Sequence, residues 1–317
     1  MIVPTTHAIS LLVAILATAC WGSWANTYKL AGGWRFELYG YDFAFGVALA
    51  ALAAAFTLGT LGSELSFSDN FLIAGKLKMA AGVGCGLILN LAVFLILAAV
   101  SVAGMSVAFP ISFGVALVAG GRHGTGIAWI AGLLLVAVAV VMDAIAWAWA
   151  DRPARMAGTK GIVLSLAGGL LLAAFFPLAS WAQTEDNGLG PYSLILLLAA
   201  GVFVSTIVYN MYFLNLPVQG PALAISDYFR GASRQHLLGL AGGAIWCTGT
   251  LAFLVVESVP APVQAGRLGH GLFQAAPVVS ALWGLLVWKE FGGAGRGTKW
   301  LLAGTLLFFA CGVVLLA

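Results

Sequence analysis

Two amide side chains, Asn90 and Gln274, lie well inside long apolar stretches of the sequence. An amide carries two donors and an acceptor in one plane, so it can bind the edge of a urea or a nucleobase through paired hydrogen bonds. An unpaired polar group costs about 1–3 kcal/mol in apolar surroundings, so each amide needs a partner or a ligand. The alternative for Asn90 is a hydrogen bond between two helices with no role in binding.

Two prolines, Pro110 and Pro277, interrupt apolar stretches and mark predicted helix breaks. Proline frees a backbone carbonyl, and such breaks are tolerated best along a cavity. An indole ring could stack on a planar ligand. The alternative is structural, with serines bonded to their own helices and tryptophans as membrane anchors. The remaining candidate binding residues are Trp21, Ser23, Trp24, Ser106, Ser112, Trp246, Thr248, Thr250 and Ser280.

Three charged residues, Lys29, Asp42 and Glu290, are candidates for a gate or for ion coupling. We expect Lys29 to pair with Asp42, and Glu290 to pair with Lys299. Plain anchoring salt bridges are the alternative. A proton-coupled carrier needs a group that titrates as its exposure changes. No acid lies at the middle of a predicted span, so the sequence shows no proton relay and leaves facilitated diffusion open.

The cysteines and histidines form no recognisable site. They show neither C-x-x-C nor H-E-x-x-H spacing, so the sequence indicates neither a metal site nor an intramembrane enzyme, and we expect no cofactor. A net charge of +3 without a basic cluster argues against nucleic-acid binding. The cysteines are Cys20, Cys85, Cys247 and Cys311, and the histidines, all at span ends, are His7, His123, His236 and His270.

The composition predicts an all-α integral membrane protein. Of 317 residues, 62% are hydrophobic and only 8% are charged, whereas soluble domains have about 25% charged residues. No basic residue precedes the first apolar run, which favours a retained helix over a signal peptide. Ten runs are long enough to cross a bilayer, and the third and fourth should form a tight hairpin. The predicted spans are 8–28, 40–61, 78–99, 102–120, 126–147, 161–182, 191–213, 237–256, 270–288 and 299–316.

The basic residues predict the orientation. Cytoplasmic loops are enriched in Lys and Arg, and the loops after odd-numbered spans hold ten of the 14 such residues. We therefore expect these loops to be cytoplasmic and both termini to lie outside the cell membrane. The ten are Lys29, Arg35, Arg152, Arg155, Lys160, Arg230, Arg234, Lys289, Arg296 and Lys299, and the other four are Lys76, Lys78, Arg122 and Arg267.

The two halves of the sequence resemble each other in register. Residues 23–27, SWANT, end the first span, and residues 180–184, SWAQT, end the sixth. Asn90 corresponds to Thr250 at an offset of 160 residues, so the two are expected to face each other across a pseudo-twofold axis. A five-helix repeat crosses the membrane an odd number of times, so its copies are inverted and their matching segments form opposite gates. The predicted units are a first repeat 1–150, a short cytoplasmic connection 151–160 and a second repeat 161–317.

Several short motifs carry a family resemblance. The most specific is 274–284, QAAPVVSALWG, followed by Lys289-Glu290-Phe291. The others are residues 22–24, 41–42, 57–59, 61–62 and 90–92, and Phe213-Leu214 with Pro217 and Gly220. Through these motifs, and over nearly its whole length, the chain resembles a bacterial member of the ureide permease family in the drug/metabolite transporter superfamily. The connection 151–160 is shorter than the central loop of plant members.

The resemblance implies two inverted five-helix repeats around a cavity that Asn90 faces, with Asp42 and Glu290 at family positions. It implies proton-coupled import of a ureide or nucleobase, such as allantoin or uracil, by alternating access. A rhamnose- or glucose-type porter and a metabolite or drug exporter are the alternatives. The resemblance also makes the fifth span peripheral, so Asp143 is interpreted as structural. The expected partners are a small solute, a proton and the lipid bilayer, in a monomer or homodimer.

Overall fold

The computed structural model describes residues 1–62, 64–120, 126–150, 155–184, 187–260, 263 and 272–316, and its regular structure there is entirely helical. In this part of the chain, eight helices are long and apolar enough to cross a membrane, and two shorter apolar helices, Met105–Gly120 and Leu272–Val287, accompany them. These segments fall on the predicted spans. Arg122, Arg152, Arg267, His123 and His270, and residues 151–154 of the predicted connection, lie outside the described residues.

The elements are introduced here in chain order. They are α1 His7–Ser23, α2 Ala25–Leu30, α3 Phe36–Phe56, α4 Phe67–Ile73, α5 Lys76–Ala103, α6 Met105–Gly120, α7 Ile127–Trp149, α8 Arg155–Gln183, α9 Pro191–Asn215, η1 Ile225–Arg230, α10 Ser233–Ser258, α12 Ala276–Leu282, η2 Trp283–Val287 and α13 Arg296–Leu316. The short elements α4 and η1 lie outside the predicted spans. They occupy the α3–α5 and α9–α10 connections.

Local breaks in the helices follow from glycine and proline. Gly104 alone joins α5 to α6, and its φ of 90° is readily adopted only without a Cβ. This is the predicted tight hairpin. Pro277 lies in the first turn of α12, where its missing N–H needs no partner, so the helix restarts there. α6 continues through Pro110 instead, so the predicted break at that position is not seen.

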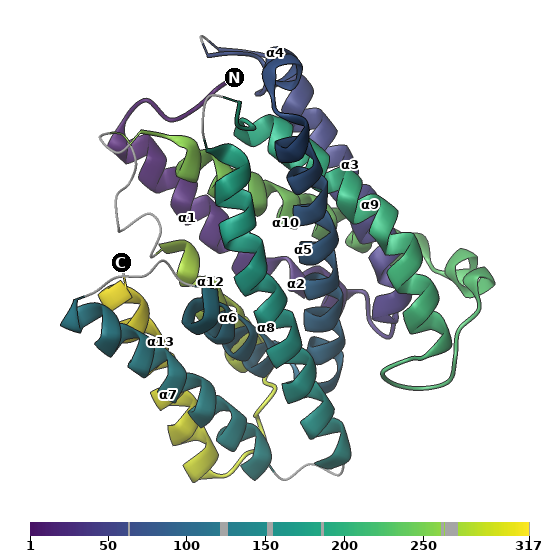
Figure 1. Ribbon diagram of the computed structural model, residues 1–317. Coiled ribbons are helices and arrows are strands. Elements are labelled where there is room, and N and C mark those ends of the chain that lie inside the picture. The colour runs from purple at the N-terminus through teal and green to yellow at the C-terminus, as the bar shows by residue number, and fades with distance from the viewer. Residues whose placement is uncertain are drawn as a thin grey trace.

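Helices from the two halves of the chain pack against one another. α1 packs on α10, α5 packs on α8 and α9, and α3 packs on α9 and α10. α7 and α13 lie side by side at the edge of the molecule (Figure 1). Glycine allows the close approach, because a Cβ on Gly86 would lie 2.1 Å from the Leu198 carbonyl oxygen of α9. Small residues at such contacts are typical of helices that associate in a bilayer.

Large apolar side chains cover the outside of these helices. Leu12, Leu49, Ile127, Val204 and Val314 are each at least 60% exposed. Such a surface is stable against lipid rather than water, and the helices satisfy their own backbone hydrogen bonds. The outward-facing side chains and the apolar helices together indicate a multi-pass membrane protein.

Candidate functional site

A cavity of about 590 Å³ opens at one end of the bundle, between the C-terminal ends of α6, α8 and α10. A second cavity of about 510 Å³ adjoins it and shares Ser180, Gln183, Thr184 and Glu257 with it. We call the end defined by these four residues and Gln274 the open end. A concave site of this size, with mostly apolar walls and a few polar groups, is typical of small-molecule binding.

Two amide groups line the larger cavity. Gln274 is only 8% exposed, and its Oε1 has no hydrogen-bond partner in the described part of the chain. Oε1 of Gln183, on α8, likewise has no hydrogen-bond partner in that part of the chain. Phe176, Phe253 and Phe273 supply aromatic wall, and the rings of Phe253 and Phe273 stack with centroids 4.3 Å apart. Unpaired acceptors beside flat rings suit a planar solute that donates N–H groups.

An aromatic cluster packs behind Phe273. The ring of Trp21 lies 4.8 Å from that of Phe273 and stacks on that of Trp246 at 5.9 Å. Nε1 of Trp21 donates to Oγ1 of Thr250 at 3.0 Å. Trp21, Trp24 and Trp246 are all buried. The tryptophans that the sequence offers for stacking on a solute therefore pack against other protein rings in this conformation.

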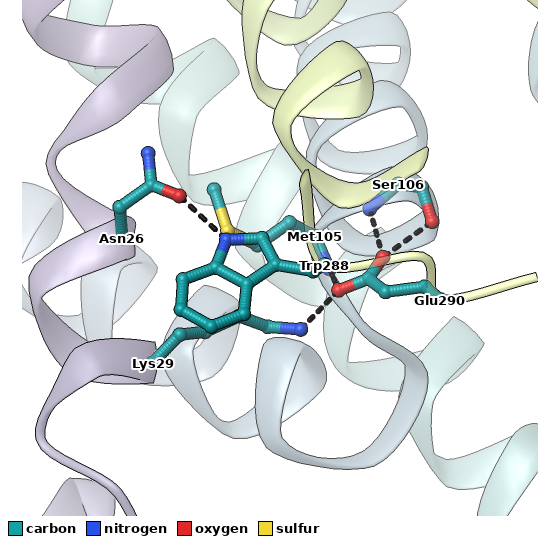
Figure 2. A network of polar contacts seen from close by, with 6 residues as sticks. All are labelled: Asn26, Lys29, Met105, Ser106, Trp288 and Glu290. Atoms are coloured by element: carbon teal, nitrogen blue, oxygen red, sulfur yellow. Dashed lines mark hydrogen bonds and ion pairs between the residues drawn. The ribbon is translucent and has the colours of Figure 1, made fainter. Parts of the chain in front are cut away.

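At the opposite end, Glu290 joins three segments of the chain (Figure 2). It follows η2 and forms an ion pair with Lys29 of α2. Its carboxylate accepts the backbone N–H groups of Met105 and Ser106, at 2.8 and 2.9 Å, and also the Ser106 hydroxyl. These N–H groups begin α6, and a helix N-terminus favours a negative charge.

The environment of Glu290 keeps its carboxyl group charged. Burial raises the pKa of Glu290, but the Lys29 ammonium and the hydrogen bonds from Lys29 and Ser106 outweigh burial and hold the pKa below its usual value. Two glycines leave room for the carboxylate. A Cβ on Gly104 would lie 2.6 Å from the carboxyl carbon, and one on Gly284 would lie 2.5 Å from Oε2.

Two indole groups add hydrogen bonds at this end. Nε1 of Trp288 donates to Oδ1 of Asn26 at 2.7 Å, and Nζ of Lys29 lies 5.3 Å from the centre of the Trp288 ring (Figure 2). Nε1 of Trp283 donates to Oγ of Ser23 at 3.0 Å. These contacts tie the end of the first span to the end of the ninth. We call the end formed by Ser23, Asn26, Lys29, Ser106, Trp283, Trp288 and Glu290 the sealed end.

Asp42 belongs to a different cluster from the one expected. The Tyr228 hydroxyl donates to Oδ1 of Asp42 at 2.6 Å, and Nδ1 of His236 lies 2.9 Å from Oδ2. Burial and the hydrogen bond to Asp42 raise the pKa of Tyr228. The predicted pairs were therefore wrong. Asp42 bonds to His236 and Tyr228 because α10 packs on α3, and Lys29 pairs with Glu290 while Lys299 stays exposed.

Asn90 lies between α5 and α9. It is 0% exposed, and its Nδ2 donates to the hydroxyls of Ser205 and Thr206 at 2.8 and 3.0 Å. It does not line the open-end cavity, so the structure does not bring Asn90 and Gln274 to a common site. Thr250, its counterpart in the sequence repeat, bonds to Trp21 instead. These contacts favour the interhelical alternative for Asn90.

The other predicted hydroxyl groups are dispersed. Oγ of Ser112 donates to the Ser165 carbonyl at 2.9 Å and so joins α6 to α8. Thr248 bonds to the Ala244 carbonyl of its own helix. Ser280 is buried, and its hydroxyl has no partner among the described residues. Gln274 is thus the predicted binding residue that lines the cavity.

Several residues at these sites were missed from the sequence. Gln183 could have been found, because it matches Asn26 within the two copies of the SWANT and SWAQT motif. Pro177 lines the cavity and interrupts an apolar stretch in the same way as Pro110. Glu257 and His236 carry no such signal. His236 lies in the first turn of α10 and Glu257 in its last, where a polar residue needs no special reason.

Comparisons with known proteins point to transport. The chain is 26% identical to Ureide permease 1 of Arabidopsis thaliana over 165 residues, which are 49% of this chain and 41% of that protein. The match thus spans less than half of the relative's length. No known family profile matches the chain. A protein of known crystal structure has the same fold, with a TM-score of 0.58 and 19% identity over 98% of this chain and 99% of that chain.

The apolar helices and the likeness to a permease support a membrane transporter rather than an enzyme.

Proposed function

We propose that the chain is a secondary transporter that imports a small neutral polar solute by alternating access. The contrast between its two ends carries this proposal. One end holds an open cavity, and the other is closed by an ion pair and several hydrogen bonds. A carrier that exposes one site to each side in turn needs one end closed while the other is open.

Two inverted repeats, 1–150 and 161–317, account for this contrast. In these repeats α1, α3 and α5 correspond to α8, α9 and α10. The packing of α1 on α10 then corresponds to that of α8 on α5, and the packing of α3 on α10 corresponds to that of α9 on α5. The contacts of α7 with α13 and of α3 with α9 join corresponding helices. This pairing supports the repeat. The SWANT and SWAQT motifs then belong to opposite gates.

The solute that we propose is a ureide or a nucleobase, such as allantoin or uracil, and the coupling ion is a proton. The carbonyl oxygens of Gln183 and Gln274 accept its N–H groups, while the aromatic wall packs against its ring. A sugar would have to bury several hydroxyls against this mostly apolar wall, at a cost for each one left unpaired. The likeness to Ureide permease 1 points in the same direction.

The proposed orientation follows the distribution of basic residues. The sealed end faces the cytoplasm, the open end faces outward, and both termini lie outside the cell membrane. A reporter fused after Ala317 then reads as extracytoplasmic. A cytoplasmic reading from a functional fusion would reverse the orientation without affecting the repeat.

Uptake into liposomes tests the proposed solute. Purified protein is reconstituted, and uptake of labelled allantoin, uracil, rhamnose and glucose is measured with and without an inward proton gradient. We expect saturable uptake of allantoin or uracil, faster with the gradient. Uptake of a sugar alone would reassign the substrate class. Lack of both binding and uptake for all four solutes would overturn the proposal.

A further inference from the structure

Asp143 is a buried acid inside a helix that is long and apolar enough to span a membrane. It lies on α7 and is 0% exposed, and neither of its carboxyl oxygens has a hydrogen-bond partner in the described part of the chain. An ionised carboxylate without a partner is very costly to bury, whereas a neutral carboxyl costs much less. An ionisable residue in such a position is by default a functional candidate.

The surroundings of Asp143 connect it to the sealed end. Trp147 lies one turn further along α7, on the same face as Asp143. Its ring packs edge-on against that of Phe291, with centroids 6.1 Å apart, and Phe291 directly follows Glu290. Val107 of α6 belongs to the same apolar cluster as these two aromatic rings. A buried anion, Glu290, is therefore the sequence neighbour of the ring that packs on the Asp143 face of α7.

We propose that Asp143 is a proton-binding site linked to the opening of the sealed end. Its carboxyl group is protonated while that end is closed and releases the proton when the end opens. This inference rests on the proposed function and replaces the structural interpretation of Asp143. It also supplies the titrating group that the sequence of the spans did not reveal.

The charges around Asp143 agree with this role. Glu290 is held as an anion by Lys29 and by the N-terminus of α6, so a second negative charge beside it is unfavourable. α6 carries no titratable side chain, and Asp143 is the only charged residue of α7. Among the described side chains of the neighbouring segments, the titratable groups other than Glu290 are exposed to the surroundings: Lys160 of α8, Lys289, and Arg296, Lys299 and Cys311 of α13.

Opening the sealed end changes these conditions. The Glu290 network separates, and water reaches the space behind Trp147 and Phe291. One proton then passes from a carboxyl oxygen of Asp143 to water, leaving a carboxylate and a hydronium ion. Closing the end again requires the carboxylate to regain one proton. Over the pH range in which Glu290 stays charged, higher pH therefore favours the open form of this end, and lower pH favours its closed form.

Thiol labelling measures this linkage without any solute. Thr27→Cys reports on the sealed end and Thr184→Cys on the open end, each in a protein whose four native cysteines are replaced by alanine. We expect the ratio of the Thr27→Cys to the Thr184→Cys labelling rate to rise with pH. A single linked proton changes the equilibrium by at most about tenfold per pH unit. In Asp143→Asn, which mimics the neutral acid, the ratio stays low and independent of pH.

Asp227→Asn is the matched control, because Asp227 lies in η1, outside the candidate membrane-spanning helices, and pairs with Arg230. It should keep the pH response of the parent protein. A flat ratio in the parent protein, or an unchanged response in Asp143→Asn, would overturn the linkage. Because no solute is present, these outcomes are separate from a failure of the uptake experiment.

Infrared spectroscopy covers the case in which Asp143→Asn does not fold. The parent protein is labelled with ¹³C-aspartate, and the C=O stretch of a protonated aspartic acid is followed as the pH rises. We expect such a band near neutral pH and its loss at higher pH. Absence of any protonated aspartic acid near neutral pH would contradict the proposal.

Discussion

The sealed end and the open end use matching sequence motifs in opposite ways. Asn26 and Gln183 occupy the same place in SWANT and SWAQT. Asn26 accepts a hydrogen bond from Trp288, whereas Oε1 of Gln183 has no partner in the described part of the chain and lines a cavity. At the sealed end the protein satisfies its own polar groups. At the open end two amide oxygens have no hydrogen-bond partner in the described part of the chain.

The side chains opposite the two motifs explain the difference in closure. Trp283, six residues after Pro277, reaches Ser23 with its indole nitrogen. The residue six positions after Pro110 is Ala116, which is too short to reach across and instead lines the cavity. A bulky donor thus closes one end, and a small residue leaves space at the other.

Removing the charge of Glu290 should have the largest effect on the difference between the sealed end and the open end. Glu290→Gln loses the ion pair with Lys29 and weakens the bonds to α6, and hydrogen bonds to a charged group contribute about 1.5–3 kcal/mol. Labelling of Thr27→Cys should therefore become roughly 10- to 150-fold faster, while labelling of Thr184→Cys slows. The control variant Asp227→Asn, in η1, should leave both rates unchanged. Equal acceleration at both ends would indicate general unfolding rather than opening of one gate.

Strong acid should weaken the contacts that Glu290 makes at the sealed end. Because the pKa of Glu290 is lowered in the folded protein, its charge stabilises the folded state at pH values above the unfolded pKa. That stabilisation is lost as the pH falls through the lower, folded pKa. The melting temperature of the parent protein should approach that of Glu290→Gln only below the usual titration range of glutamate. A constant difference between the two proteins down to strongly acidic pH would contradict this assignment.

Replacing the amides of the open end should affect binding rather than gating. Gln274→Leu removes an acceptor from the cavity, and one hydrogen bond contributes about 0.5–1.5 kcal/mol, so solute affinity should fall roughly 3- to 10-fold. Gln183→Leu should act similarly. Equilibrium binding of labelled uracil or allantoin measures the change. Unaltered affinity in both variants would remove these amides from the site.

Asn26→Leu is the counterpart of Gln183→Leu at the sealed end. It removes the acceptor for Trp288, so labelling of Thr27→Cys should rise by about 3- to 10-fold, the equivalent of one hydrogen bond. Solute affinity measured with the open end accessible should change little. If Asn26→Leu and Gln183→Leu had the same effect on affinity, the distinction between the two ends would fail.

The smallest effect on binding is expected at Asn90, which belongs to neither end. Asn90→Ala removes bonds to Ser205 and Thr206 of α9 and should lower the melting temperature while leaving solute affinity within about twofold, below the effect of one hydrogen bond. The sequence alone favoured a loss of affinity at this position. A 3- to 10-fold weaker affinity with unchanged stability would restore that interpretation.

The helices could be predicted because a bilayer imposes a simple requirement. A segment that crosses it must be apolar for about 20 residues and must bond its own backbone groups. The long helices α5, α9 and α10 are therefore visible in the sequence. The hairpin at Gly104 was visible as well, because almost no polar residues separate two apolar runs. Short elements such as α4 and η1 carry too few residues to show a periodic pattern.

The site was harder to predict because residue type does not specify which neighbour a side chain meets. Gln274 was identified as a polar group at a helix break, and it lines the cavity. Asn90 carries the same amide group, yet its side chain bonds to α9. Asp42 and Glu290 were expected to bond to other partners, since only the packing of α10 on α3 and the turn after η2 determine which charged groups meet.

The sequence by itself determined that this protein lies in a membrane, where its helices run and which polar residues are too costly to be accidental. These properties follow from local composition, which lipid selects directly. Tertiary structure decided that Glu290 meets Lys29 and α6, that Gln183 and Gln274 share one cavity, and that Asp143 is enclosed beside the sealed end. Those outcomes depend on contacts between residues more than 80 positions apart, and no local pattern encodes such contacts.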